Sequence, residues 1–225
     1  MDLKKHLDRA EDALQRGQPD FALELCDQVL DFAPGEARAA GLFARACLAL
    51  GGKGLLGRLG AGAGGLAARL SRLTRNAEGE ARARRRAFLK DPGSAAQGIL
   101  WAEALERAGH TEAALGVLGA LADQDGEAAR RAGALAAELG QVEEAIEYYG
   151  KALEANPRDT EAIRARKNLA AERALRTKRY DEAGSAMDVA LDQEAFLRAA
   201  RGLEAAPEAG DGNGEEAGEP EEDPS

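Results

Sequence analysis

Few residues of this chain have the types and spacing that enzymatic chemistry requires. Its only two histidines are His6 and His110, and the carboxylates near them are better explained as helix surface charge than as metal ligands or catalytic partners. Glu143 and Glu144 are adjacent, so they lie on different faces of a helix and cannot act as a pair. Motifs of the GxSxG, HExxH and CxxC types do not occur. These observations predict a protein that is not an enzyme and holds no metal or cofactor.

Two further groups of residues could suggest a ligand. Residues 52–57 and 60–65 fit the letters of the GxGxxG dinucleotide motif, but neither stretch follows a predicted strand, and no GxxxxGK[ST] motif occurs. Cys26 and Cys47 lie in helical patterns without the spacing of a metal site. We expect both cysteines to behave as small buried hydrophobic residues.

The composition predicts an all-α protein. Only 4% of the 225 residues are aromatic, and alanine and leucine dominate the apolar residues. Such a core suits closely packed helices better than strands, which favour β-branched and aromatic side chains. The net charge of −10 is unevenly spread, because residues 53–90 hold ten lysines or arginines against two glutamates and residues 204–225 hold nine acidic and no basic residues.

The same composition indicates a cytoplasmic protein. The chain opens on a charged amphipathic helix without the apolar stretch of an export signal. No uncharged run approaches the roughly 18–20 residues that a membrane-spanning helix needs.

A spacing pattern recurs along the chain. Gly17, Ala22 and Pro34 repeat the intervals of Gly140, Ala145 and Pro157, with five residues from glycine to alanine and twelve from alanine to proline. A glycine after a helix can take the left-handed conformation that closes it, an alanine lets a second helix cross closely, and a proline stops that helix. The pattern predicts helical hairpins, which must stack because a single hairpin cannot bury its own apolar face. Gly109 and Ala114 belong to the same pattern, and Trp101, Leu105, Leu118 and Leu121 are expected in the stacking core.

At these residues the sequence resembles the tetratricopeptide repeat family. The best match is residues 139–157, where the small, aromatic and terminal proline positions of the family repeat are reproduced almost throughout. The resemblance covers residues 3–36 and 95–193. It implies hairpin repeats stacked as a short right-handed solenoid, as in a bacterial interaction scaffold.

Four segments follow from the repeat and its interruptions. We expect a repeat plus one helix at 1–52, a basic Gly/Arg-rich linker at 53–90, a repeat array with a capping helix at 91–203, and a disordered acidic tail at 204–225. The capping helix should run from Asp181 to Gly202.

The resemblance also implies where a partner binds, because the first helix of each family repeat lines a concave groove. Applied to this chain, that rule predicts a partner-binding groove lined by Ile99, Glu103, Glu106, Arg107, Arg130, Glu138, Arg164 and Asn168. Arg130 and Arg164 stand 34 residues apart, at equivalent positions, and an arginine fork suits carboxylate recognition. The expected function is a scaffold or adaptor that holds another protein or a peptide segment, with no small-molecule substrate.

The basic segment leaves alternatives open. It could be a decayed helix with a long linker, a peptide that docks on a partner, or a short amphipathic helix on an anionic membrane surface. The last case would make the protein a peripheral membrane or envelope-assembly factor anchored through residues 54–75. Nucleic-acid binding through Arg82 and Arg84–Arg86 is less favoured, since aromatic residues for base stacking are not interleaved with them.

Overall fold

The computed structural model describes residues 2–51, 76–176 and 178. Three predicted features lie outside these residues: the amphipathic segment 54–75, the capping helix from Asp181 to Gly202, and the acidic tail 204–225. Within the described residues every regular element is a helix and none is a strand. The prediction of an all-α helical-repeat solenoid is confirmed.

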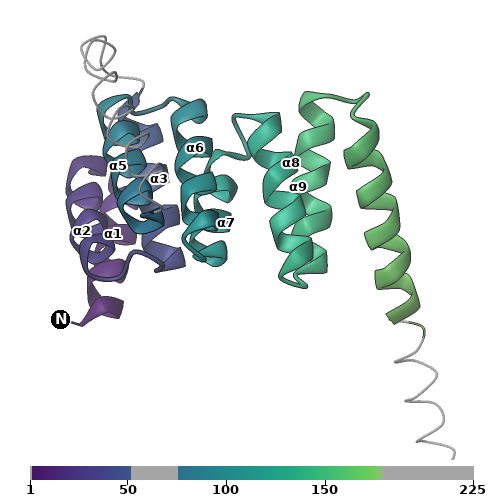
Figure 1. The fold of residues 1–225 in the computed structure, drawn as a ribbon, viewed down its shortest axis with the longest axis horizontal. Coiled ribbons are helices and arrows are strands. Elements are labelled where there is room, and N and C mark those ends of the chain that lie inside the picture. The colour runs from purple at the N-terminus through teal and green to yellow at the C-terminus, as the bar shows by residue number, and fades with distance from the viewer. Residues whose placement is uncertain (1, 52–75, 177, 179–225) are drawn as a thin grey trace, which may run out of the picture. The chain divides into compact units, whose positions relative to one another are not determined.

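The helices follow one another as short antiparallel elements within a compact unit that comprises residues 1–175 (Figure 1). Their bounds are α1 Leu3–Gln15, α2 Pro19–Phe32, α3 Ala37–Gly51, α5 Ala77–Lys90, α6 Ala95–Arg107, α7 Thr111–Leu121, α8 Gly126–Glu138 and α9 Val142–Ala155. A further helix starts at residue 160 and is described through residue 176.

Glycine ends the first helix of three hairpins, as the spacing pattern predicted. Gly17, Gly109 and Gly140 have φ of 71°, 83° and 75°, a conformation that other residues rarely adopt. In each case the glycine directly follows the last turn of a helix and reverses the chain into α2, α7 or α9. The helices α2 and α9 end just before Pro34 and Pro157, so the predicted stop signals are confirmed as well.

The predicted core residues are buried. Ala22, Ala114 and Ala145 have no exposed surface, which agrees with their expected place at helix crossings. Trp101 of α6 is 1% exposed, and its ring centroid lies 5.2 Å from that of Phe43 in α3 and 6.2 Å from that of Phe88 in α5. The other predicted core residues, Leu105, Leu118 and Leu121, are buried in the same cluster. One core therefore joins residues from both sides of the undescribed segment 52–75.

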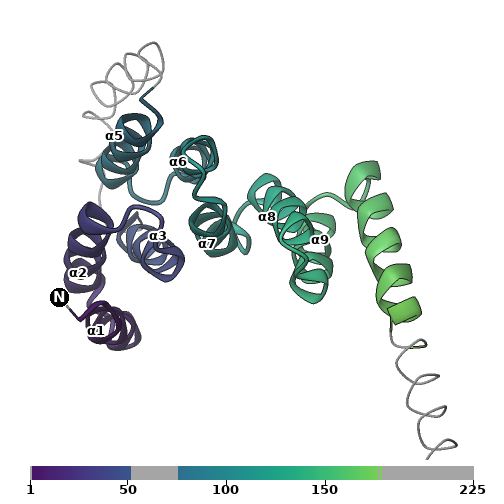
Figure 2. The same cartoon turned by 60° about the horizontal axis from the view of Figure 1, so that its bottom comes forward.

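The helices form two rows within this unit (Figure 2). In one row α1 packs against α3, and α3 packs extensively against α7. In the other row α5 packs against α6, while α2 bridges to α3. In the hairpin of α6 and α7, the second helix therefore lies in the row of α1 and α3, and the first helix lies in the other row.

Glycines permit the close packing of α3 and α7. A Cβ atom at Gly116 would lie 2.6 Å from the backbone oxygen of Ala37, and one at Gly41 would lie 3.1 Å from the backbone oxygen of Gly116. Backbone atoms of a helix cannot move aside as the end of a flexible side chain can. A larger residue at Gly116 would therefore push the two helices apart.

Residues 77–90 differ from the sequence prediction of a linker over 53–90, because they form the helix α5. Phe88 has no exposed surface, and Arg85 is only 4% exposed. The Arg85 guanidinium forms an ion pair with Asp31 and lies 3.0 Å, Nε to Oδ1, from Asp27, both on α2. The arginine-rich composition predicted a solvated linker. The helix forms because α5 is held by buried charged groups as well as by apolar side chains.

A second buried charge fixes α5 to α6. Glu80 is 2% exposed, and its Oε1 accepts a hydrogen bond of 2.7 Å from Nη2 of Arg107. Removing a carboxylate from water costs several kcal/mol, which a well-oriented guanidinium offsets. These two ion pairs clamp α5 between α2 and α6.

Both cysteines are buried, as predicted. Cys26 of α2 and Cys47 of α3 are free thiols without exposed surface. Burial raises the pKa of the Cys26 thiol to about 12, and it raises the pKa of the Cys47 thiol as well. The thiolate forms are thus suppressed, so these residues act as core packing.

Replacing Gly116 with alanine tests the close approach of α3 and α7. The matched control is Gly150→Ala, because Gly150 also lies inside a helix but a Cβ there would meet nothing within 4 Å. Both changes gain the same helix propensity, so Gly116→Ala is expected to be less stable than Gly150→Ala by about 1–3 kcal/mol. Urea unfolding measures the difference, and equal stabilities would show that the contact has room for a methyl group.

The double change Asp27→Asn and Asp31→Asn tests the anchoring of α5. It leaves the buried Arg85 without a counter-charge, and we expect a loss of about 3 kcal/mol, the lower end for a buried charge because both carboxylates are partly exposed. Glu24→Gln, at an exposed site on the same helix, is the control and should change the free energy of unfolding by less than about 0.5 kcal/mol. If the two variants were equally stable, Arg85 would not hold α5 in place.

Candidate functional site

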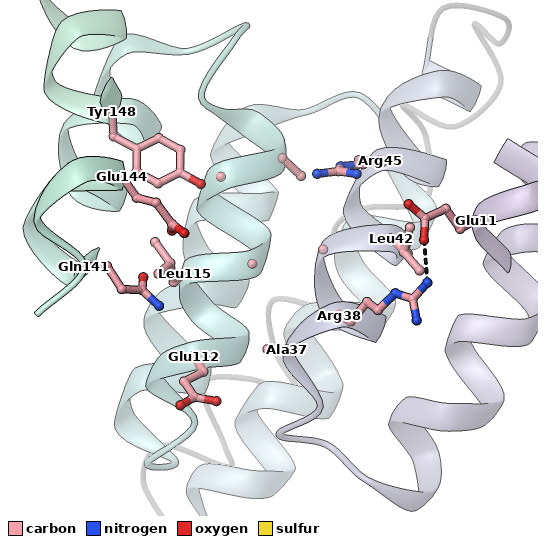
Figure 3. A pocket seen from close by; sticks show the side chains of 14 residues that line it. Glu11, Ala37, Arg38, Leu42, Arg45, Glu112, Leu115, Gln141, Glu144 and Tyr148 are labelled. Carbon is pink, nitrogen blue, oxygen red and sulfur yellow. Dashed lines mark hydrogen bonds and ion pairs between the residues drawn. The ribbon is translucent and has the colours of Figure 1, made fainter. Parts of the chain in front are cut away.

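A cleft of about 420 Å³ opens between two walls, one carried by α1 and α3 and the other by α7 and α9 (Figure 3). This volume lies within the usual range of ligand sites. The side chains that line it are polar on the walls and small or aliphatic on the floor. They are Glu11, Ala37, Arg38, Gly41, Leu42, Arg45, Glu112, Leu115, Gly116, Gly119, Ala120, Gln141, Glu144 and Tyr148.

The packing of α3 on α7 determines the floor of the cleft. Gly41 and Gly116, which allow the two helices to approach, also line the cleft, together with the aliphatic side chains of Leu42 and Leu115. Glycine adds no side chain above the helix surface. The floor is therefore low and apolar, and it exposes little that could form a hydrogen bond through a side chain.

The wall on α3 carries two arginines with different surroundings. Arg38 donates hydrogen bonds to Asp8 (Nη1 to Oδ1, 2.8 Å) and to Glu11 (Nη2 to Oε2, 2.5 Å), so α1 neutralises its charge. Arg45, two turns further along α3, is exposed and makes no ion pair with any residue in the described ranges. Arg45 is therefore a cation at the cleft that no described carboxylate neutralises.

The opposite wall carries free carboxylates. Glu112 of α7 and Glu144 of α9 are exposed, and neither forms an ion pair within the part of the chain that the structure describes. Gln141 and Tyr148 complete this wall. The two walls therefore face one another with opposite charges.

Tyr148 is half-buried between the wall and the floor. A Cβ at Gly119 would lie 2.5 Å from the Tyr148 hydroxyl, so the end of the ring lies directly over this glycine. Burial raises the pKa of the Tyr148 phenol, and the nearby Glu144 raises it further, while Lys151 and Arg45 lower it. Tyr148 thus stays a neutral hydroxyl that can both donate and accept a hydrogen bond.

The cleft continues into a second hollow of about 480 Å³. Both hollows share Arg45, Gly119, Ala120 and Tyr148, so Arg45 and Tyr148 stand at the junction. Beyond them Lys151 pairs with Asp123 (Nζ to Oδ1, 2.6 Å), and its ammonium lies 5.8 Å from the centroid of the Tyr148 ring. The two hollows together therefore form one continuous path.

The groove residues that the family rule predicted on α6 form a different arrangement. Glu103 accepts a hydrogen bond from Arg131 of α8 (2.6 Å), and Arg107 bonds Glu80 of α5. Glu106 is exposed beside this network, and partial desolvation is the main reason that its pKa is raised. The network links α5, α6 and α8.

The other predicted groove residues are spread along the molecule. Arg130 bonds Glu127 (2.9 Å) and Glu161 (2.9 Å), so it ties α8 to the helix that starts at residue 160. Glu138 of α8, and Arg164 and Asn168 of the last described helix, are exposed or partly exposed, while Ile99 is partly buried against the core. These predicted residues, with those of the α5–α6–α8 network, do not line the cleft, and partner binding by them stays a prediction.

The reason for this difference is the side on which α7 packs. The family rule places the first helix of each hairpin at the groove, which would select α6 and α8. Here α7 lies against α3, so the cleft is lined by α7 and α9, the second helices of their hairpins. The family rule therefore does not select the cleft residues Arg45, Glu112, Glu144 and Tyr148. Gly41 and Gly116 are the sequence signal of close helix packing at this site.

The histidines have structural contacts. His110 Nε2 lies 2.6 Å from Oε1 of Glu78 at the start of α5, and His6 Nδ1 lies 3.0 Å from the backbone oxygen of Asp2. Among the described residues, no group of three or more histidine, cysteine or acidic side chains could hold a metal ion. In the same residues, no helix is both long and apolar enough to cross a bilayer.

Stacked helical hairpins of this kind define a helical-repeat protein. Residues 126–159 match the family model described as Tetratricopeptide repeat, and they comprise α8 and α9. Residues 126–159 therefore form a tetratricopeptide repeat, as the sequence had suggested.

Solved structures with related folds are only distantly similar. A MamA protein is 16% identical, with a TM-score of 0.41 over 78% of this chain and 85% of its own. YrrB, described as a TPR protein with an unusual peptide-binding site, is 18% identical, with a TM-score of 0.40 over 72% of this chain and 90% of its own. A thermophilic TPR protein of Thermus thermophilus is 20% identical, with a TM-score of 0.37 over 75% of this chain and 98% of its own. A comparison with curated proteins gives no match.

The ionisation of Tyr148 tests the surroundings of the cleft wall. Because Glu144 raises the pKa of this phenol, Glu144→Gln should lower the midpoint of its alkaline titration, whereas Glu143→Gln should leave it unchanged. A phenol with a raised pKa stabilises the fold below its unfolded value of about 10, and that contribution is lost as the pH rises through the folded value. Tyr148→Phe should therefore lose less stability than the unaltered chain above about pH 10. Phenolate absorbance and urea unfolding measure the two effects, and identical midpoints in both glutamate variants would contradict this account.

Proposed function

We propose that this protein is a scaffold that binds a segment of a partner polypeptide in the cleft between the α1–α3 wall and the α7–α9 wall. The observation that carries the proposal is an apolar floor between walls whose charged groups, Arg45, Glu112 and Glu144, are free within the described residues. Tetratricopeptide repeat proteins bind peptides or other proteins, which supports the class of partner.

The floor and walls supply different contributions to binding. Covering Leu42 and Leu115 removes apolar surface from water, which favours binding whatever the partner sequence. Charged groups on the walls add selectivity. A partner without opposite charges would remove water from these groups and form no ion pair in exchange, so it would bind more weakly. An open cleft continued by a second hollow suits a chain that passes through, more than a compact small molecule.

The helices α5, α6 and α8, which do not line the cleft, are joined to one another by ion pairs. Arg131 pairs with Glu103 and Arg107 pairs with Glu80, so these ion pairs crosslink α5, α6 and α8, which we call the outer row. The cleft itself is lined from the other row. We assign to the predicted residues Glu103 and Arg107 a role in holding the outer row, which keeps the walls at a fixed separation.

Blocking the cleft with a large side chain tests the proposal. Gln141 lines the cleft, is exposed, and makes no capping hydrogen bond with its side chain, so Gln141→Trp should fill space without loss of stability. Peptides selected from a displayed random library on the full chain should bind Gln141→Trp at least tenfold more weakly, about 1.4 kcal/mol.

The control for this experiment is Gln28→Trp, at an exposed position on α2 that does not line the cleft. It should bind the selected peptides as the unaltered chain does. If Gln141→Trp and Gln28→Trp bound all selected peptides equally well, the cleft would not be the binding site.

A further inference from the structure

The two walls of the cleft carry unpaired opposite charges that face each other. Arg45 lies on the α3 wall, and Glu144 and Glu112 lie on the α7–α9 wall (Figure 3). None of the three forms an ion pair with another described residue. The open space of the cleft separates the charges, so a ligand between the walls would contact both.

Several other charged residues of neighbouring helices do pair. Arg38 bonds Asp8 and Glu11 across α1 and α3, and Lys151 of α9 bonds Asp123 in the turn after α7. The pair of Arg38 with Glu11 lines the cleft, and the pair of Lys151 with Asp123 lines the adjoining hollow. The unpaired charges of the cleft differ from these pairs, because the open space of the cleft separates them from the opposite charges on the facing wall.

The cleft and the adjoining hollow form one continuous path, which suits an extended ligand. Several residues of an extended segment fit along the cleft and the adjoining hollow. In such a segment, successive side chains point to opposite sides.

We infer that the cleft selects an extended polypeptide segment in which two neighbouring residues carry opposite charges. The acidic residue points to Arg45 and the basic residue points to Glu144 and Glu112, while the backbone crosses the glycine and leucine floor. This inference rests on the proposed function and adds the chemistry of the partner segment.

The geometry around Arg45 favours a carboxylate as its ligand. A guanidinium offers a planar fork that bonds both oxygens of a carboxylate. Tyr148 stands at the same junction of the two hollows, and its neutral hydroxyl can donate a further hydrogen bond to that group. On the other wall, Glu112 and Glu144 each offer carboxylate oxygens that can accept hydrogen bonds from a lysine or arginine.

Selection from a displayed library of random twelve-residue peptides tests the inference on the full chain. Peptides that bind the unaltered protein should be enriched in an acidic residue next to a basic one. A synthetic peptide of this kind should bind Arg45→Glu at least tenfold more weakly, and exchanging its acidic residue for lysine should restore binding to that variant. Glu144→Arg should likewise weaken binding, and an acidic residue in place of the basic one should restore it.

Two charge reversals outside the cleft are the controls. Glu143 is exposed beside Glu144 and Arg9 is exposed on α1, and neither lines the cleft. Glu143→Arg and Arg9→Glu should bind the peptide within about twofold of the unaltered chain, because exposed charges at a distance are screened by salt.

The outcomes separate this inference from the proposed function. If the selected peptides lose affinity for Gln141→Trp but carry no charge pair and bind Arg45→Glu normally, the inference is overturned and cleft binding stands. If their affinity is the same for Gln141→Trp as for the unaltered chain, the proposed function itself is overturned. Equal effects of Arg45→Glu and Arg9→Glu would show that only the net charge matters, and this too overturns the inference.

Discussion

The close contact of α3 with α7 is the constraint on which the rest of the structure depends. Gly41 and Gly116 let the two backbones meet, and a methyl group at Gly116 would collide with the backbone of α3. This contact puts α7 in the row of α1 and α3, brings α9 to the same side, and forms the cleft floor. It also leaves α6 beside α5, where Trp101 meets Phe88. The contact at Gly41 and Gly116 thus determines which faces of α1, α3, α7 and α9 line the cleft.

Charges have two roles in this molecule, and burial separates them. Arg85 and Glu80 are almost fully buried, and each has an oppositely charged partner on a neighbouring helix. Such pairs hold α5 in place at a high cost of desolvation. Arg45 and Glu144 are exposed and retain their hydration. An exposed charged side chain can form an ion pair with a ligand without disturbing the fold. The same residue types therefore anchor a helix in one row and remain free for binding in the other.

Local features could be predicted from the sequence, whereas the choice of packing side could not. The left-handed glycines, the buried alanines and the helix-ending prolines act within a few residues, so spacing alone identified them at Gly17, Ala22 and Pro34. The helix α5 was missed because its arginines suggest a solvated linker unless Asp27 and Asp31 are known to lie opposite Arg85. The cleft residues were missed because the row of α7 is fixed by a contact between helices far apart in the chain.

The contact between α3 and α7 also affects how the repeats fold together. In an ordinary solenoid each repeat touches only its sequence neighbours, so units can be added or lost and the chain folds from any nucleus outward. Here a closely packed helix pair spans α5, α6 and the segment 52–75. Bringing α3 and α7 together requires closing that long loop, which slows folding but joins the repeats on both sides into one cooperative block. Descendants of this chain could vary in length at either end, while the stretch from α3 to α7 would be inherited whole.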